Sequence, residues 1–449
     1  MRRFKVKYDG LLFAILMVLL FMPIIQEWTK PFKFKPLRGV IKPTPKPVLT
    51  LESYRENNFP KQAEKHLSEN FGMREPVIRF YNQYLYDFYR KSTNETVVVG
   101  KDHWVYYKNN VNDYYGTEMS HWFDSNEEAK EAFDTEARLM WKLRGVLKEY
   151  GVDFMVFMAP EKSFVYPEHL PRGDFDTSSI NARDYYASQF DAYGFPYIEM
   201  TKWFIDIKAA DTLSYPVFPQ TGMHWNFSSV YAMDSLLRFM GDLKNRTLPK
   251  LRIGAFHKNS ITTEHGDHDI EYLANLARPI PTQANQHYEA DVDVVTDENT
   301  WHPNVLFVGS SFLERMYYFV PFDSLFSYSE YWYYNSTVRY GKHYGKTMPL
   351  YEKDVLKTLL ESDYVVWQAD GGQMYEASFG FVELALMYLC FSDETIYLRH
   401  KHLMDSLGIS SHQARDTMLK HFETCFPEIA GDGIPTIRNP RISIIKNNN

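Results

Sequence analysis

The sequence predicts an α/β fold in which helices cover both faces of a mostly parallel β-sheet, making three layers. Helical and strand-like segments alternate through the middle of the 449-residue chain, which is the order that parallel strands with crossover helices require. The strand-like segments are continuous apolar runs, as expected for strands buried on both faces. An N-terminal transmembrane helix and a helical C-terminal extension are predicted to flank this domain.

The amino terminus has the pattern of a membrane anchor. Residues 11–25 read LLFAILMVLLFMPII, follow four cations and are closed by the interfacial aromatic residue Trp28. The run lacks a small-x-small cleavage site, so we predict retention, with a cleaved signal peptide or a buried helix of a soluble protein as the alternatives. Four cations also follow the span, so the number of positive charges is equal on its two sides and does not predict its orientation. A long body crosses more readily than a tail of ten residues with four cations, which predicts a body outside the cytoplasm.

The rest of the chain is predicted to fold in alternating segments. Residues 59–89 have apolar residues near helical spacing, broken at Gly72 and Pro76 into two helices. Ser125 opens a further helix that ends at Gly151. The predicted strands are 97–99, 152–160, 196–200, 304–309 and 363–368. The predicted divisions are a cytoplasmic tail at 1–10, a transmembrane signal anchor at 11–27, a linker rich in proline and lysine at 28–58, the α/β domain at 59–380 and the helical extension at 381–449.

The composition limits the class of protein. Hydrophobic residues make up 45% of the chain and aromatic residues 16%, which is enough for a large core and excludes a disordered chain. The net charge of -8 does not attract a polyanion, so nucleic acid is not an expected partner. The two cysteines, Cys390 and Cys425, have neither metal-ligand spacing nor the number that a disulfide framework needs.

The strongest local signal for chemistry is VLFVGSSFLERM at 305–316. A buried strand ends at Gly309 and runs directly into a helix, which places Ser311 at the helix amino terminus. Free backbone N–H groups there can stabilise an oxyanion, and a tight turn exposes the hydroxyl at the edge of the sheet. The alternative is that Ser310 or Ser311 only caps the helix.

A second signal is the segment PQTGMHWNFSSV at 219–230. His224 precedes an amphipathic helix and therefore lies on a loop. An imidazole on a loop held by a rigid sheet can supply the proton transfer that a serine nucleophile needs. An ordinary surface histidine is the alternative.

These two segments belong to a longer resemblance, which covers residues 55–375. The chain resembles the alginate O-acetyltransferase family, SGNH-hydrolase-like proteins that acetylate bacterial exopolysaccharides. The family's usual motifs are Asp-x-His-Trp and Gly-Asp-Ser-Phe, so the resemblance implies that His224 is the base and Ser311 the nucleophile. It also implies an SGNH-hydrolase-like fold that needs no cofactor. Five landmarks carry it in order: HLSENFGMRE (66–75), GKDHWVYY (100–107), APEKSFVYPEHLP (159–171), TGMHW (221–225) and VLFVGSSF (305–312).

Two positions depart from the family's motifs. Gly222 stands where the family has the aspartate that orients the histidine, and Ser310 stands where it has aspartate or threonine. Loss of the orienting carboxylate in a catalytic triad can cost roughly 10⁴ in turnover. Candidates for the orienting or oxyanion-binding groups are Thr221, Ser310 and Asp370, with Asp211 considered for its loop position.

The resemblance implies transfer of an acetyl group to a hydroxyl of a cell-surface or secreted polysaccharide. Family members receive acetyl groups from a membrane-bound O-acyltransferase, so such a partner is expected at the bacterial inner membrane, with the domain in the periplasm. Two other functions stay open. One is a carbohydrate acetyl esterase, which uses water as the acceptor. The other is a polysaccharide-binding or scaffold protein with weakened catalysis, which Gly222 and the aromatic content favour.

Several further residues are candidates for binding. Trp225, Tyr166 and Arg315 are candidate substrate-binding residues. The aromatic run 331–334 could stack on sugar rings or form a sheet face. One loop has the composition of a metal cluster but lacks helical HExxH spacing, so no metal is predicted. Its residues are His257, Glu264, His265, Asp267, His268 and Asp269.

Overall fold

The chain divides into two compact units in a computed structural model that describes residues 2–39, 44–56, 58–211, 213, 215–259, 267–282, 287–390, 433–435, 439, 441, 442 and 445. Residues 1–99 with 269–281 form the first, called here the N-terminal unit, and residues 100–268 with 282–449 form the second, the sheet unit. Of the predicted extension at 381–449, most lies outside the described residues.

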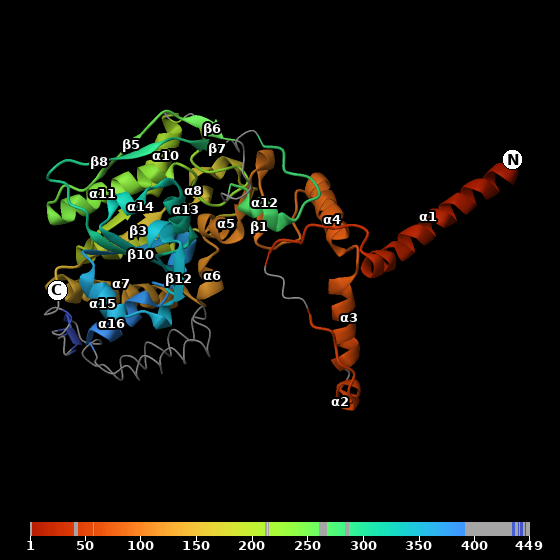
Figure 1. Ribbon diagram of the computed structural model, residues 1–449, viewed down its shortest axis with the longest axis horizontal. Helices are drawn as coiled ribbons and strands as arrows, with labels where there is room; N and C mark the ends of the chain where they lie inside the picture. Colours follow the sequence, from red (N-terminus) through yellow and green to blue (C-terminus); the bar gives the residue numbers. More distant parts are fainter. Residues whose placement is uncertain are drawn as a thin grey trace. The chain divides into compact units, whose positions relative to one another are not determined.

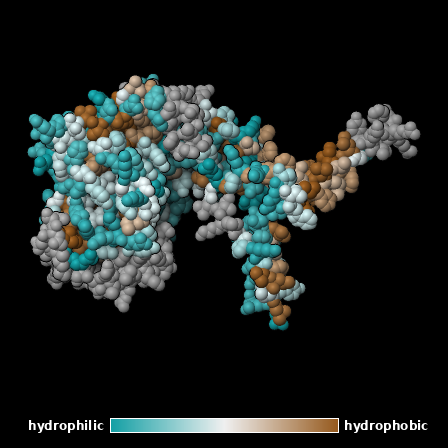
Figure 2. All heavy atoms as spheres, in the orientation of Figure 1, coloured by the Kyte–Doolittle hydropathy of each residue, from teal (hydrophilic) through white to brown (hydrophobic). Residues whose placement is uncertain are grey.

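The described part of the N-terminal unit consists of helices and one short strand. Its helix α1 (Arg2–Thr29) includes a stretch from Asp9 to Thr29 that is long and apolar enough to cross a bilayer, with a mean hydropathy of 2.2. Its 21 residues rise about 30 Å, the thickness of a hydrocarbon core. Figure 2 shows the apolar surface of this helix. The other elements are α2 (Leu51–Arg55), α3 (Asn58–Asn70), α4 (Arg74–Tyr89), β1 (Val97–Val99) and α12 (Asp269–Ala274).

The centre of the sheet unit is a seven-stranded sheet in the order β12-β11-β10-β9-β13-β3-β4. Five neighbouring strands, from β10 to β4, run parallel, and β11 and β12 add an antiparallel edge. The predicted mostly parallel sheet is therefore confirmed. The strand bounds are β3 (Asp153–Ala159), β4 (Tyr197–Glu199), β9 (Asn304–Gly309), β10 (Tyr328–Tyr333), β11 (Thr337–Tyr340), β12 (Lys346–Pro349) and β13 (Tyr364–Asp370).

Helices cover both faces of this sheet, as predicted for three layers. In Figure 1, α7, α15 and α16 lie on one side of the strands and α10, α11 and α13 on the other. The helix bounds are α5 (Lys108–Tyr115), α6 (Met119–Trp122), α7 (Asn126–Glu149), α8 (Lys162–Val165), α9 (Ala182–Tyr193), α10 (Thr201–Ala209), α11 (Ser229–Lys244), α13 (Ser311–Phe319), α14 (Phe322–Leu325), α15 (Val355–Glu361) and α16 (Phe381–Cys390). Short strands complete the unit: β2 (Val105–Tyr107), β5 (Lys250–Ile253), β6 (His257–Asn259), β7 (His287–Glu289) and β8 (Val292–Val295).

The core follows from the alternation of side chains along the buried strands. Phe154, Val156 and Met158 of β3 join the core beneath α7 and α16, whereas Phe157 points to the opposite face and packs near Trp225. All seven residues of β13 are buried, as the apolar run predicts. The first helix of the predicted extension, α16, packs into this same core.

The antiparallel edge was not predicted from the sequence. The aromatic run at 331–334 begins in strand β10, where Tyr331 and Trp332 are fully buried, and its last residue follows the strand. The run could either stack on sugar rings or form a sheet face, and these two residues belong to a buried sheet face. The sequences of β11 and β12 contain Lys, Thr and Arg side chains. They therefore lack the long apolar runs from which the central strands were predicted.

Candidate active site

Two adjacent serines at the end of β9 have different environments. Ser310 is the N-cap of α13: its fully buried hydroxyl accepts from the backbone N–H of Phe312 (3.3 Å) and donates to Oε1 of Gln368 (3.1 Å). Ser311 is the first helical residue and is partly exposed. The capping reading therefore applies to Ser310, which leaves the Ser311 hydroxyl available for other contacts.

Gly309 makes this turn possible through space rather than through an unusual backbone angle. It lies opposite Gln368 in the register of β9 with β13. A Cβ at Gly309 would come within 2.9 Å of Oε1 and 3.0 Å of Cβ of Gln368. A larger residue would push the two strands apart beside the serines.

The structure brings together the two residues that the sequence analysis singled out for chemistry. Nε2 of His224 lies 2.7 Å from Oγ of Ser311, although 87 positions separate them in the sequence. The ring of Phe312 packs against the imidazole, with 5.0 Å between ring centroids. This distance allows the imidazole to accept the serine proton directly.

A buried lysine holds the loop that carries His224. Nζ of Lys162 donates to the backbone carbonyl oxygens of Val105 (2.7 Å), Gln220 (2.9 Å) and Gly222 (2.8 Å). It also lies over the rings of Trp104 and Tyr106, 4.9 and 5.0 Å from their centroids. All three ammonium hydrogens are thus used, and two of them fix the loop within four residues of His224.

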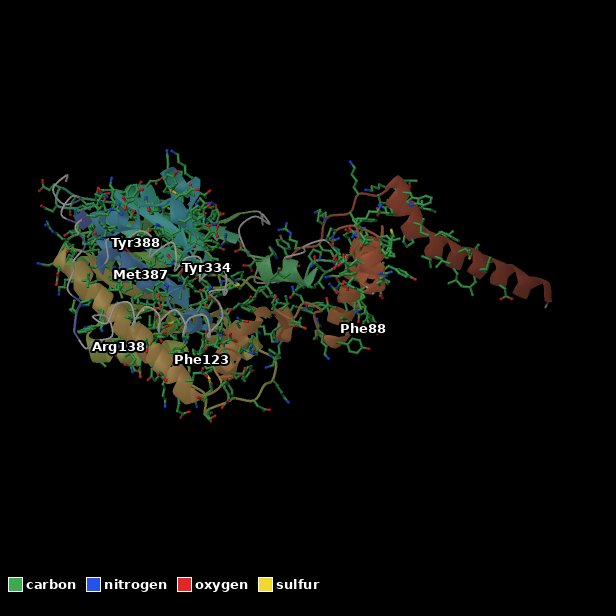
Figure 3. The ribbon with its side chains drawn as sticks, turned by 90° about the horizontal axis from the view of Figure 1, so that it is seen from below. Phe88, Phe123, Arg138, Tyr334, Met387 and Tyr388 are labelled. Carbon is green, nitrogen blue, oxygen red and sulfur yellow. The ribbon has the colours of Figure 1, made fainter. Side chains whose placement is uncertain are left out.

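The opposite side of Ser311 is formed by Tyr334, at the end of β10. Its hydroxyl lies 3.5 Å from Oγ of Ser311 and accepts a hydrogen bond from Nε2 of Gln373 (2.9 Å). Gln373 belongs to a 3₁₀ helix, Gly371–Glu376, that Asp370 caps by accepting from the backbone N–H of Gln373 (3.0 Å). Figure 3 labels Tyr334 within the sheet unit.

A buried carboxyl group also accepts a hydrogen bond from the backbone of that 3₁₀ helix. Glu161 accepts from the backbone N–H of Gly372 (2.8 Å) and from the Asn110 side chain. Burial, and then the charges of Asp113 and Asp370, raise the pKa of Glu161 well above its usual range. Burial likewise raises the pKa of Asp370 to about 7. Neutral carboxyl groups are the form that this interior tolerates.

The candidates for orienting His224 make other contacts in the described part of the chain. The hydroxyl of Thr221 donates to the carbonyl oxygen of Asp267 (3.1 Å) and lies 2.9 Å from Nδ1 of His268. Asp370 lies at the carboxyl edge of the sheet, as its position after the strand predicts, but its carboxylate faces Gln373. Asp211 follows α10 in a left-handed backbone conformation.

The three candidate substrate-binding residues are buried supports of the site. Trp225 is fully buried and donates through Nε1 to the carbonyl oxygen of Phe312 (2.9 Å). Tyr166 is 7% exposed and accepts from the backbone N–H of Val217. Arg315 is 4% exposed and pairs with Asp267 at 2.7 Å. These positions argue against direct contact of the three side chains with a polymer.

Three residues beside the site were missed as individual candidates: Lys162, Tyr334 and Gln373. Lys162 lies in the landmark APEKSFVYPEHLP, and Gln373 follows Asp370 at the end of a predicted strand, so position after a strand was the available signal. In the loop with the composition of a metal cluster, Glu264 and His265 lie outside the described residues, and the described residues contain no cluster of metal-ligand type.

Comparisons with known proteins find a matching family model and several similar solved structures. Residues 97–335 match the family model described as SGNH hydrolase-like domain, acetyltransferase AlgX. A comparison with curated proteins found no match. The similar solved structures include the O-acetyltransferase domain of Pseudomonas putida AlgJ, Pseudomonas aeruginosa AlgX and Bacillus cereus PatB1.

These three structures are distant in sequence. The identity is 15% to AlgJ, 14% to AlgX and 12% to PatB1, with TM-scores of 0.40, 0.40 and 0.36. The matches cover 62%, 69% and 63% of this chain and 92%, 71% and 98% of the respective structures. The family model, in contrast, spans more than half of the chain and includes both His224 and Ser311. This protein therefore belongs to the SGNH hydrolase-like acetyltransferase family of AlgX, as the sequence motifs predict.

Proposed function

We propose that the protein is an O-acetyltransferase that acts on hydroxyl groups of a cell-surface or secreted polysaccharide through an acetyl-enzyme on Ser311. The observation that carries this proposal is the distance of 2.7 Å between Nε2 of His224 and Oγ of Ser311 at the amino terminus of α13. Family membership supports acetyl transfer as the chemistry.

The proposed reaction has two steps that use the same two side chains. Oγ of Ser311 attacks the carbonyl carbon of the acetyl donor while Nε2 of His224 takes the serine proton. The donor's oxygen leaves with that proton, and the acetyl group stays on Ser311. An acceptor hydroxyl then attacks the acetyl carbon and gives its proton to His224, which returns it to Oγ as the ester product leaves.

The partners and the location belong to the same proposal. The predicted signal anchor at 11–27, within the apolar stretch Asp9–Thr29, would hold the protein in the bacterial inner membrane as a single span, with residues 1–10 in the cytoplasm and the sheet unit in the periplasm. A membrane-bound O-acyltransferase would supply acetyl groups from across the bilayer. The polysaccharide would then be acetylated after export.

The test uses the purified full-length protein in detergent, with p-nitrophenyl acetate as donor and a de-acetylated bacterial exopolysaccharide oligomer as acceptor. We expect nitrophenol release, an acetyl group on the peptide that contains Ser311 and acetylated oligomer, each detected by mass spectrometry. Ser311→Ala should lose all three. Ser310→Ala is the matched control for folding and nearby packing, because it removes a neighbouring hydroxyl that serves as the cap.

The outcomes separate the candidate functions. Nitrophenol release without acetylated oligomer would favour an acetyl esterase. Equal rates for the wild-type protein and Ser311→Ala would exclude catalysis at this serine and favour a polysaccharide-binding protein.

A further inference from the structure

Tyr334 is fixed beside Ser311 by its own backbone. Its backbone N–H donates to the carbonyl oxygen of Gly309 (2.9 Å), which ends the neighbouring strand β9 directly before the two serines. Its ring packs against those of Tyr333 and Phe379, with 4.7 and 5.2 Å between centroids. The phenol hydroxyl is therefore held at 3.5 Å from Oγ of Ser311 by the turn that directly follows strand β10.

The hydrogen bonds around Gln373 determine which way the phenol hydrogen points. The backbone N–H of Asp370 donates to Oε1 of Gln373 (3.3 Å), which leaves Nε2 facing Tyr334. Nε2 donates to the phenol oxygen at 2.9 Å. A phenol oxygen that accepts from an amide can still donate its own hydrogen to another acceptor. The neighbouring oxygen that can accept it is Oγ of Ser311.

The phenol also stays protonated. Burial raises the pKa of Tyr334 to about 12, the Ser311 hydroxyl opposes this rise and the charge of Asp370 adds to it. At any pH at which His224 can act as a base, the hydroxyl is thus a neutral hydrogen-bond donor. A donor fixed in advance, in a partly dehydrated place, is the arrangement that stabilises developing negative charge.

We propose that Tyr334 is a catalytic residue that donates a hydrogen bond to the oxyanion of the tetrahedral intermediate on Ser311, and that Gln373 is the positioning residue that aims it. When Oγ bonds to the acetyl carbon, the electron pair of the carbonyl bond moves to the carbonyl oxygen, which becomes the oxyanion. That oxygen and Oγ share one carbon, so a hydroxyl beside Oγ can reach both. On collapse the electron pair returns, the leaving oxygen takes the proton from His224, and Tyr334 keeps its hydrogen throughout.

This inference rests on the proposed acyl-transfer function, and Tyr334→Phe in the full-length protein tests it. We expect kcat for p-nitrophenyl acetate to fall about 10²–10³-fold, the usual effect of removing one oxyanion donor, with KM changed by less than about threefold. Tyr333→Phe is the matched control, because it removes a phenol hydroxyl from the adjacent residue and keeps the ring. It should behave like the wild-type protein.

A second variant tests the direction of the hydrogen bond. In Gln373→Glu a carboxylate replaces the amide donor and attracts the phenol hydrogen away from Ser311, so kcat should fall to a similar extent. Because both changes remove the same interaction, Gln373→Glu should cost little more in a Tyr334→Phe background. Two full, additive losses would contradict the proposed hydrogen-bond direction.

The failure of this inference differs from the failure of the proposed function. If Ser311→Ala is inactive while a folded Tyr334→Phe keeps kcat within about threefold of wild type, Tyr334 is not an oxyanion donor and the acyl-enzyme stands. If Ser311→Ala retains wild-type activity, the proposed function itself is wrong. Circular dichroism and the Tm of each variant establish that the comparison is made between folded proteins.

Discussion

The two sides of Ser311 are built from different chemistry. On one side His224 lies on a loop, and a buried ammonium group, Lys162, holds that loop through backbone carbonyl oxygens. On the other side Tyr334 lies in the turn directly after β10 and accepts from the amide of Gln373. The 3₁₀ helix of Gln373 is capped by Asp370, a carboxyl group whose pKa burial raises. The difference teaches that a side chain outside the regular strands can be positioned either by a buried cation that binds backbone carbonyl oxygens or by an amide whose helix a buried carboxyl group caps.

The largest expected effect comes from removing the imidazole. His224→Gln keeps a polar side chain of similar reach but cannot accept and return a proton, so kcat/KM for p-nitrophenyl acetate should fall by about 10⁴-fold or more. His169→Gln is the control, because His169 stacks on Trp104 without touching Ser311. A loss under about tenfold would assign the base to another group.

The support of the imidazole side is tested next. Lys162→Met preserves much of the side-chain length but removes the hydrogen bonds to three buried carbonyl oxygens, so the free energy of unfolding should fall by about 3 kcal/mol. Activity should fall as well, because the loop before His224 loses its fixed position. Denaturant unfolding and kcat/KM measure the two effects.

Lys208→Met is the matched control for Lys162→Met. Lys208 also donates to a carbonyl oxygen, that of Val165, but its side chain is 28% exposed, so water can replace the lost donor. An equal loss of stability in both variants would show that burial of the ammonium is not what matters.

The smallest expected effect concerns the carboxyl groups on the phenol side. The pKa of Asp370 is raised from 3.8 to about 7 in the folded protein, so the folded state binds more protons than the unfolded state between these values. This stabilisation is fully present below pH 3.8 and is lost as the pH rises through about 7. Between about pH 5 and 7 the free energy of unfolding should therefore fall by up to about 2.5 kcal/mol from this group.

Asp370→Asn checks the pH effect, because the amide oxygen can still cap the 3₁₀ helix but cannot ionise. Denaturant unfolding at pH 5 and at pH 7 should show a smaller fall with pH in this variant than in the wild-type protein. A steeper fall in Asp370→Asn would mean that another carboxyl group in this region takes up the proton in its place.

Much of the fold was predictable because its strands are buried on both faces. The apolar runs at 152–160 and 304–309 correspond to β3 and β9, and Ser125 caps α7 as predicted. The antiparallel edge was not predictable in the same way. Strands β11 and β12 carry polar side chains and join the sheet in turn, because β11 pairs with β10 and β12 pairs with β11.

For the site, local patterns made Ser311 and His224 candidates: a strand that turns into a helix, and a loop before an amphipathic helix. The resemblance to the family's motifs then assigned them as nucleophile and base. Only the tertiary structure decided that their side chains meet, that Ser310 is the cap, and that Trp225, Tyr166 and Arg315 are buried. It also brought Tyr334 to the hydroxyl of Ser311 and Gln373 to the hydroxyl of Tyr334. The physical reason is that hydrogen-bond partners far apart in the chain are chosen by the sheet order, which places the ends of β9, β10 and β13 side by side.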